Sequence, residues 1–187
     1  MVSHNLTTIP EFIIIKNRTA AFDWQGRHSG FPSGVTSIQL NLSNAGGNAN
    51  LITSLGTSTT FTLSDNGQVN GASSNTYVAY LFATKAGISK VGSYSGNGTS
   101  QTINCNFTTG ARFILIKRTD SAGDWFIWDS ARGIAAGNDP HLSLNTTAAE
   151  VTSDDSIDPD NSGFIVNQAV ATNINVNAAT YIYLAIA

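Results

Sequence analysis

An acidic stretch near the carboxyl end is the only concentration of charge in this sequence and the first place to look for chemistry. Asp158, Asp160 and Ser162 alternate ahead of Gly163, as the first oxygen ligands of a calcium loop do ahead of the glycine that permits its turn. Oxygens at this spacing can converge on Ca²⁺, so these three residues are the candidate metal ligands. Ala169 stands where such a loop has its bidentate glutamate, and the competing interpretation is therefore a solvated loop.

Aromatic and basic side chains supply the candidates for binding a glycan. Trp128 has no tryptophan counterpart in the first half of the chain, where Arg27 stands instead, followed by His28. We take Arg27, His28 and Trp128 as the candidate ligand-binding residues, because an indole face can stack on a sugar ring. Both faces of the segment that ends at Trp128 are apolar, so burial in a core is the competing interpretation.

The sequence does not indicate an enzyme, and no catalytic residue is predicted. A serine hydrolase of the Gly-x-Ser-x-Gly type is not indicated, and His4, His28 and His141 lie in unrelated contexts. A glycosidase needs two opposed carboxylates, which cannot be paired among the twelve Asp and Glu residues from sequence alone. Cys105 is the only cysteine, and its strand-like surroundings predict a small buried hydrophobe. Apart from Ca²⁺, no cofactor is expected.

Composition restricts the class of partner. Charged residues make up 11% of the 187 residues, the net charge is −3, and no cluster of Lys and Arg is present, which argues against nucleic acid. No apolar run reaches the length of a membrane span and no signal peptide is recognisable, so no membrane contact is expected. Helix formers do not occur in periodic runs, which predicts strands and turns with almost no helix.

The elements that must position these residues occur twice. Three apolar segments recur in the same order: Phe12–Lys16 as Phe113–Lys117, Trp24 as Trp125, and Thr76–Ala83 as Thr180–Ala187. Because the repeated positions are apolar, they describe a scaffold rather than a duplicated active site. We therefore expect an all-β fold of two tandem antiparallel β-sandwich modules, residues 1–85 and 86–187, which touch because no linker separates them.

The two expected modules differ by one strand. The strands expected from the apolar pattern are 11–17, 22–29, 37–42, 59–63 and 75–83, then 88–94, 101–107, 112–118, 124–130, 141–145, 163–167 and 179–187. The second module opens with a hairpin at 88–107, whereas Met1–His4 corresponds only to that hairpin's second strand. We expect a neighbouring subunit or an upstream segment to supply the missing strand, in a homo-oligomer.

Many short segments spread over nearly the whole chain match a known repeat module. The most particular are the hairpin Gly92–Gly98 and the turn Lys117–Asp120. The other matches are Ser3–Leu6 with Pro10, Phe12–Arg18, Val69–Asn70, Thr76–Ala83, Ser89–Val91, Trp125, Asp129–Arg132, Gly163–Phe164 and Thr180–Ala185. Together they resemble a module of tail fibres and other virion-associated proteins of tailed bacteriophages. The resemblance implies a structural protein that contacts other virion proteins, and it brings no catalytic residues.

These expectations give one leading function and two alternatives. The leading hypothesis is a bacteriophage virion structural protein of the tail-fibre or adhesin type, located in the virion. Its variable loops 26–34 and 133–140 would contact bacterial surface glycan on the host cell. The first alternative is a capsid decoration (cement) protein that stabilises the phage head, and the second is a glycan-degrading enzyme. Copy number in the particle separates the two structural roles.

Overall fold

A computed structural model describes residues 1–187 and consists of strands, turns and loops. The strands of the first half are β1 (Val2–Ser3), β2 (Phe12–Asn17), β3 (Gln25–His28), β4 (Ile38–Gln39), β5 (Ile52–Ser54), β6 (Thr60–Leu63) and β7 (Tyr77–Phe82). Those of the second half are β8 (Ser89–Ser95), β9 (Gln101–Asn104), β10 (Phe113–Arg118), β11 (Trp125–Asp129), β12 (Leu142–Ser143), β13 (Ile157–Asp160), β14 (Gly163–Val166) and β15 (Thr180–Ile186). No helix has the length and apolar character needed to cross a membrane.

Each half of the chain forms two antiparallel sheets. In the first half they have the strand orders β1-β6-β5 and β4-β3-β2-β7. In the second half they have the orders β13-β14-β9 and β12-β11-β10-β15-β8. No strand of the first half pairs with a strand of the second. The expected fold class, an all-β chain of two tandem antiparallel sandwiches, is confirmed.

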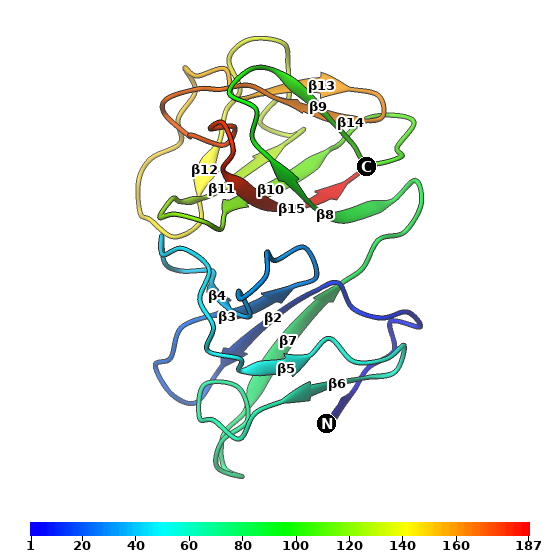
Figure 1. The fold of residues 1–187 in the computed structure, drawn as a ribbon, viewed down its shortest axis with the longest axis vertical. Coiled ribbons are helices and arrows are strands. Elements are labelled where there is room, and N and C mark those ends of the chain that lie inside the picture. Colours follow the sequence, from blue (N-terminus) through cyan, green and yellow to red (C-terminus); the bar gives the residue numbers. More distant parts are fainter.

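The two sandwiches stack to give four sheets in succession, separated by three apolar layers (Figure 1). Ile13 and Ile15 of β2 face the inner core of the first sandwich. Phe12 and Ile14 face the opposite way, into a layer shared with β10 and β15 of the second sandwich. The unbroken apolar run in β2 therefore has a physical cause, because this strand has a core on both of its faces.

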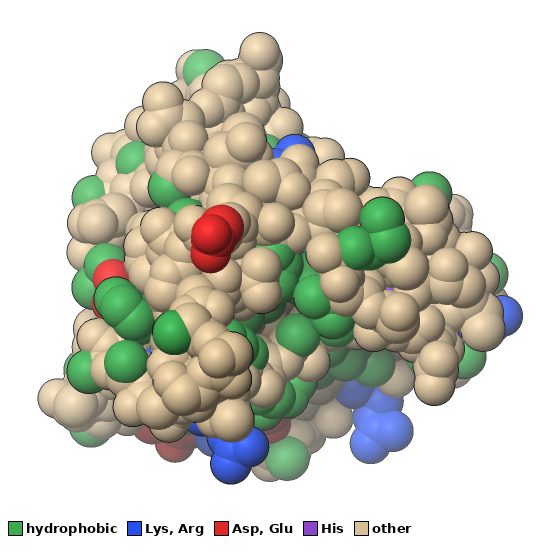
Figure 2. Space-filling model, turned by 90° about the horizontal axis from the view of Figure 1, so that it is seen from below, with side chains coloured by type: hydrophobic (Ala, Val, Ile, Leu, Met, Phe, Trp, Pro, Cys, Tyr) green, Lys and Arg blue, Asp and Glu red, His purple; other side chains and the backbone are tan.

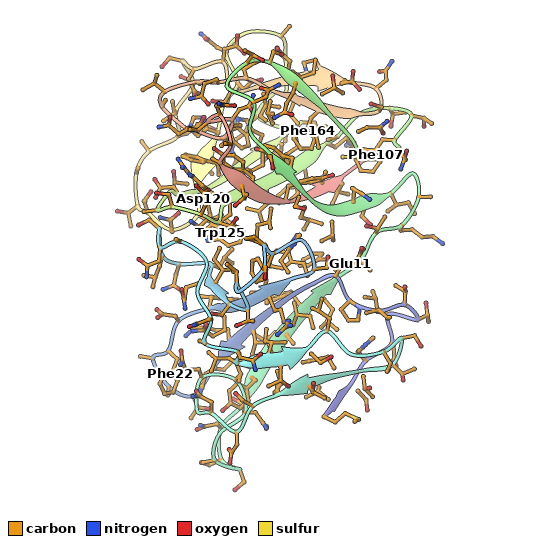
Figure 3. All side chains as sticks on the ribbon, in the orientation of Figure 1. Glu11, Phe22, Phe107, Asp120, Trp125 and Phe164 are labelled. Atoms are coloured by element: carbon orange, nitrogen blue, oxygen red, sulfur yellow. The ribbon has the colours of Figure 1, made fainter.

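Polar contacts as well as apolar ones join the sandwiches. Trp125, labelled at the junction in Figure 3, is 1% exposed and stacks on Phe12 with ring centroids 6.2 Å apart. Its indole Nε1 donates to the backbone oxygen of Gln39 at 2.8 Å. Lys117 is fully buried, and its ammonium donates to the Ser43 oxygen of the first half at 3.2 Å. Burial lowers the pKa of Lys117 to about 8.

Equivalent tyrosines show that the repeat extends to detailed contacts. The Tyr77 hydroxyl donates to the Gly67 oxygen at 3.1 Å and accepts from the Gly71 N–H at 2.8 Å. The Tyr181 hydroxyl donates to the Asn173 oxygen at 2.8 Å and accepts from a backbone N–H of the same loop at 3.0 Å. Each tyrosine thus closes the loop that leads into its own strand.

The structure adds strands that the sequence pattern did not indicate. β5 was not expected, because a three-residue strand has too few positions to show alternation. The competing interpretation of 158–163 as a solvated loop was wrong, since this segment forms the β13–β14 hairpin. Ile157, at its start, is fully buried and pairs with Val166. The two half-buried aspartates of β13 hid this strand from a search for apolar runs.

Candidate functional site

The three candidate metal ligands lie on the β13–β14 hairpin, where Asp160 and Ser162 stabilise the turn and Asp158 bonds to neighbouring segments. Asp160 Oδ1 accepts from the backbone N–H of Ser162 at 2.8 Å and from its hydroxyl at 2.6 Å, and these bonds lower the pKa of Asp160. Asp158 accepts from the Gly137 N–H at 3.3 Å and from the Asn167 amide at 2.9 Å. The structure contains no group of three or more His, Cys, Asp or Glu side chains arranged to hold a metal ion.

The three candidate ligand-binding residues do not converge on one site. Trp128 is fully buried in the core of the second sandwich. His28 is buried in the layer between the sandwiches, against Phe12. Arg27 donates to the backbone oxygen of Ile52 at 2.7 Å, which ties β3 to the outer sheet of the first sandwich. Loop 26–34, expected to face a glycan, packs with its central part against β8.

His28 makes two hydrogen bonds that fix its protonation state. The Gly30 N–H donates to Nδ1 at 2.9 Å, so Nδ1 is an acceptor. Nε2 lies 3.2 Å from the Tyr183 oxygen, and in this tautomer it carries the proton and donates. Burial lowers the pKa of His28 to about 4. The residue is therefore a neutral link between the sandwiches at pH 7.

A buried polar network in the second sandwich was not anticipated from the sequence. His141 Nδ1 lies 3.0 Å from Asp154 Oδ1, although the angles do not satisfy a hydrogen bond. The Ser156 hydroxyl donates to Asp154 Oδ2 at 2.7 Å and lies 2.8 Å from the Thr172 hydroxyl. The carboxylate stands between imidazole and serine, so no imidazole nitrogen accepts the proton of Ser156. The network joins loops and lacks the order that activates a serine nucleophile.

Asp139 is the second unexpected feature of this region. It is fully buried, and its carboxylate accepts from the N–H groups of Ile157 at 2.9 Å and Ala135 at 3.2 Å. Burial raises the pKa of Asp139 to about 6. The only sequence signal was a short acidic residue between Asn138 and Pro140, which is equally typical of an exposed turn.

One sheet edge distinguishes the two sandwiches. In the second, β8 pairs with β15 along its whole length, with Tyr94 opposite Tyr181 and Gly92 opposite Tyr183. In the first, β7 is the last strand of its sheet and pairs only with β2. The backbone carbonyls of Thr76 and Phe82 accept hydrogen bonds from the β2 side. Because backbone groups alternate sides along a strand, those of Tyr77, Ala79 and Leu81 point away from β2, toward the open edge.

Side chains on the covered strand β15 are more deeply buried than their counterparts on the uncovered strand β7. Tyr181, Tyr183 and Ala185 of β15, whose backbone groups pair with β8, are all buried. Their counterparts in β7 are Tyr77, Ala79 and Leu81. Of these, Ala79 is exposed and the other two are half-buried. The expectation from sequence that the first module lacks one strand agrees with this arrangement of strands.

An apolar groove lies beside the open edge of β7. It has a volume of about 280 Å³ and opens between β7 and the outer sheet. Figure 2 views this end of the molecule from below, and hydrophobic side chains (green) are visible in the hollow near the middle of the face. The groove is lined by Val2, Ile15, Phe61, Leu63, Val69, Asn70, Tyr77 and Ala79. Ile15 and Phe61 in this lining belong to the first core and are buried, whereas Ala79 is exposed.

The geometry defines an all-β protein of two stacked sandwiches, in which the strand that pairs with β15 in the second sandwich, β8, has no counterpart beside β7 in the first. The family described as Domain of unknown function (DUF7483) matches residues 1–187, and the chain belongs to this family. No curated protein and no solved structure matches the chain.

Proposed function

We propose that this chain is a structural protein of a bacteriophage particle, of the tail-fibre or adhesin type, which works by assembly. The observation that carries the proposal is the open β7 edge beside an apolar groove, in a molecule whose second sandwich covers the same edge. An open sheet edge presents unpaired backbone N–H and C=O groups that can pair with a strand of another chain.

The sequence supports the same proposal independently. The segments Gly92–Gly98 and Lys117–Asp120 resemble a repeat module of virion-associated proteins. The first lies at the end of β8 and in the turn toward β9, and the second spans the end of β10 and the start of the connection to β11. Other virion proteins and further copies of this chain are the proposed partners, and bacterial surface glycan is the proposed target on the host.

Locating the protein in intact particles tests the proposal. Purified virions are analysed by mass spectrometry, and antibodies against the chain are imaged on them by electron microscopy. We expect label confined to the tail and a low copy number relative to the major capsid protein. Absence of the protein from purified virions would contradict the proposal.

A second role, a capsid decoration (cement) protein, is favoured by the same edge, because a borrowed strand can clamp neighbouring capsid subunits. The same experiment separates the two roles. Label spread over the head, with a copy number comparable to that of the major capsid protein, would replace the fibre assignment by decoration.

A further inference from the structure

We propose that the open β7 edge binds an extended segment of a different protein, not of a second copy of this chain, and that the segment runs antiparallel to β7. This segment carries an aromatic side chain opposite Tyr77 and a large apolar side chain opposite Ala79. The inference deepens the proposed assembly function and rests on it. It names the chemistry of the partner segment, which the position of the protein in a particle does not reveal.

The second sandwich provides the template for this contact. There the Tyr94 ring of β8 stacks on Tyr181 with centroids 4.8 Å apart and an interplanar angle of 13°. The Tyr94 hydroxyl donates to the Ile174 oxygen at 2.6 Å. Tyr77 occupies the place of Tyr181 in the first sandwich, makes the same loop-closing bonds, and has no ring stacked on it. An aromatic side chain on the bound strand would complete that pair.

The two sandwiches differ in the side chain that fits on the covering strand at this position, opposite Tyr183 in the second and opposite Ala79 in the first. In the second sandwich Tyr183 lies directly over Gly92, and a Cβ at Gly92 would come within 2.5 Å of the tyrosine ring. Glycine is therefore required on β8. In the first sandwich Ala79 replaces the tyrosine, and the volume released is part of the apolar groove. A large apolar side chain fills this space, whereas glycine leaves it empty.

Peptides derived from β8 test the inference with the full-length protein. The probe is a fluorescently labelled peptide of residues 88–96 that carries the change Gly92→Leu. Three comparison peptides are used. The glycine peptide keeps Gly92, the alanine peptide carries Tyr94→Ala in addition to Gly92→Leu, and the third is a scrambled version of the leucine peptide. Anisotropy titration is expected to show the leucine peptide binding roughly tenfold more tightly than either the glycine or the alanine peptide.

Exchanging the key residue on the protein should exchange the preference. Ala79→Tyr restores the side chain found at Tyr183, and this variant is expected to prefer the glycine peptide over the leucine peptide. Ala79→Pro removes an outward-directed N–H without breaking the pairing with β2 and is expected to abolish binding. Circular dichroism checks the fold of both variants, and the peptide series keeps the test decisive if the proline variant does not fold.

Hydrogen exchange locates the bound strand. Binding of the leucine peptide should protect the amides of Tyr77, Ala79 and Leu81 and leave those of β15 unchanged. The proposal is overturned if no peptide binds, or if the preference does not switch with Ala79→Tyr. It is also overturned if the protein alone forms a dimer in which these three amides are already protected, since the occupant is then a second copy. These measurements use purified protein, so they can fail while the virion assignment holds.

Discussion

His28 has a structural role between the two sandwiches that its residue type alone does not predict. An imidazole beside an arginine suggested ligand contact, but the ring lies between two sandwiches and bonds to Gly30 and Tyr183. Its pKa is about 4 in the folded protein against 6.5 for the free side chain. The unfolded chain therefore binds more protons between these two values, and stability falls as the pH falls through that window.

We predict that His28→Gln flattens the acid side of the stability profile. The wild-type free energy of unfolding should lose about 3 kcal/mol between pH 7 and pH 4 through this residue, and the variant should lose none of that contribution. Urea denaturation at the two pH values measures the difference. Asp139, whose raised pKa acts in the opposite direction, is present in both proteins and cancels. Parallel profiles would show that His28 does not titrate as inferred.

The buried ammonium of Lys117 gives a second prediction at this scale. Its bond to the Ser43 oxygen crosses the junction between the sandwiches, and its bond to the Gly123 oxygen lies within the second sandwich. Lys117→Met keeps the aliphatic length but leaves the Gly123 oxygen without this donor, and we expect a loss of about 2 kcal/mol. Lys16→Met, at the equivalent but half-buried position of the first sandwich, serves as the matched control and should have a smaller effect. Chemical denaturation at pH 7 measures both.

At the scale of elements, the apolar pattern located the long strands and the repeat but not the way the sheets meet. β2 and β15 are apolar on both faces, which predicts burial without telling which core each face contacts. The stacking of the two sandwiches depends on side chains distant in the sequence, such as Phe12 and Trp125. β13 and the buried Asp139 were missed because local polarity is overridden by tertiary packing at both places.

The covering role of β8 leads to a prediction for its aromatic residue. Tyr94→Ala removes both the stacked ring on Tyr181 and the bond to the Ile174 oxygen, and we expect a loss of about 3 kcal/mol in unfolding free energy. The matched control is Tyr80→Ala, because Tyr80 lies on the uncovered strand β7 and is 48% exposed. Equal losses from the two changes would contradict the view that β8 seals the second sandwich.

At the scale of the whole molecule, the shared layer predicts that both sandwiches unfold together. Leu115 and Leu184 from the second sandwich lie in the same buried cluster as Phe12 and Ile14 from the first. Separating the sandwiches exposes this cluster, so neither is expected to remain folded after the other unfolds. Calorimetry should give a single transition with equal calorimetric and van't Hoff enthalpies. Leu184→Ala should lower its midpoint without splitting it, and two resolved transitions would refute the prediction.

The face-to-face stacking also has a consequence for how the junction responds to dilution. Equivalent faces of the two repeats meet, as in a symmetric dimer, but here the halves are tethered by the short connection between Phe82 and Ser89. The tether turns what would be a bimolecular association into an intramolecular one, with a local concentration that the solvent volume cannot change. The junction between the sandwiches therefore stays closed when the protein is diluted. Binding of another chain at the β7 edge is intermolecular and still depends on the concentration of that partner.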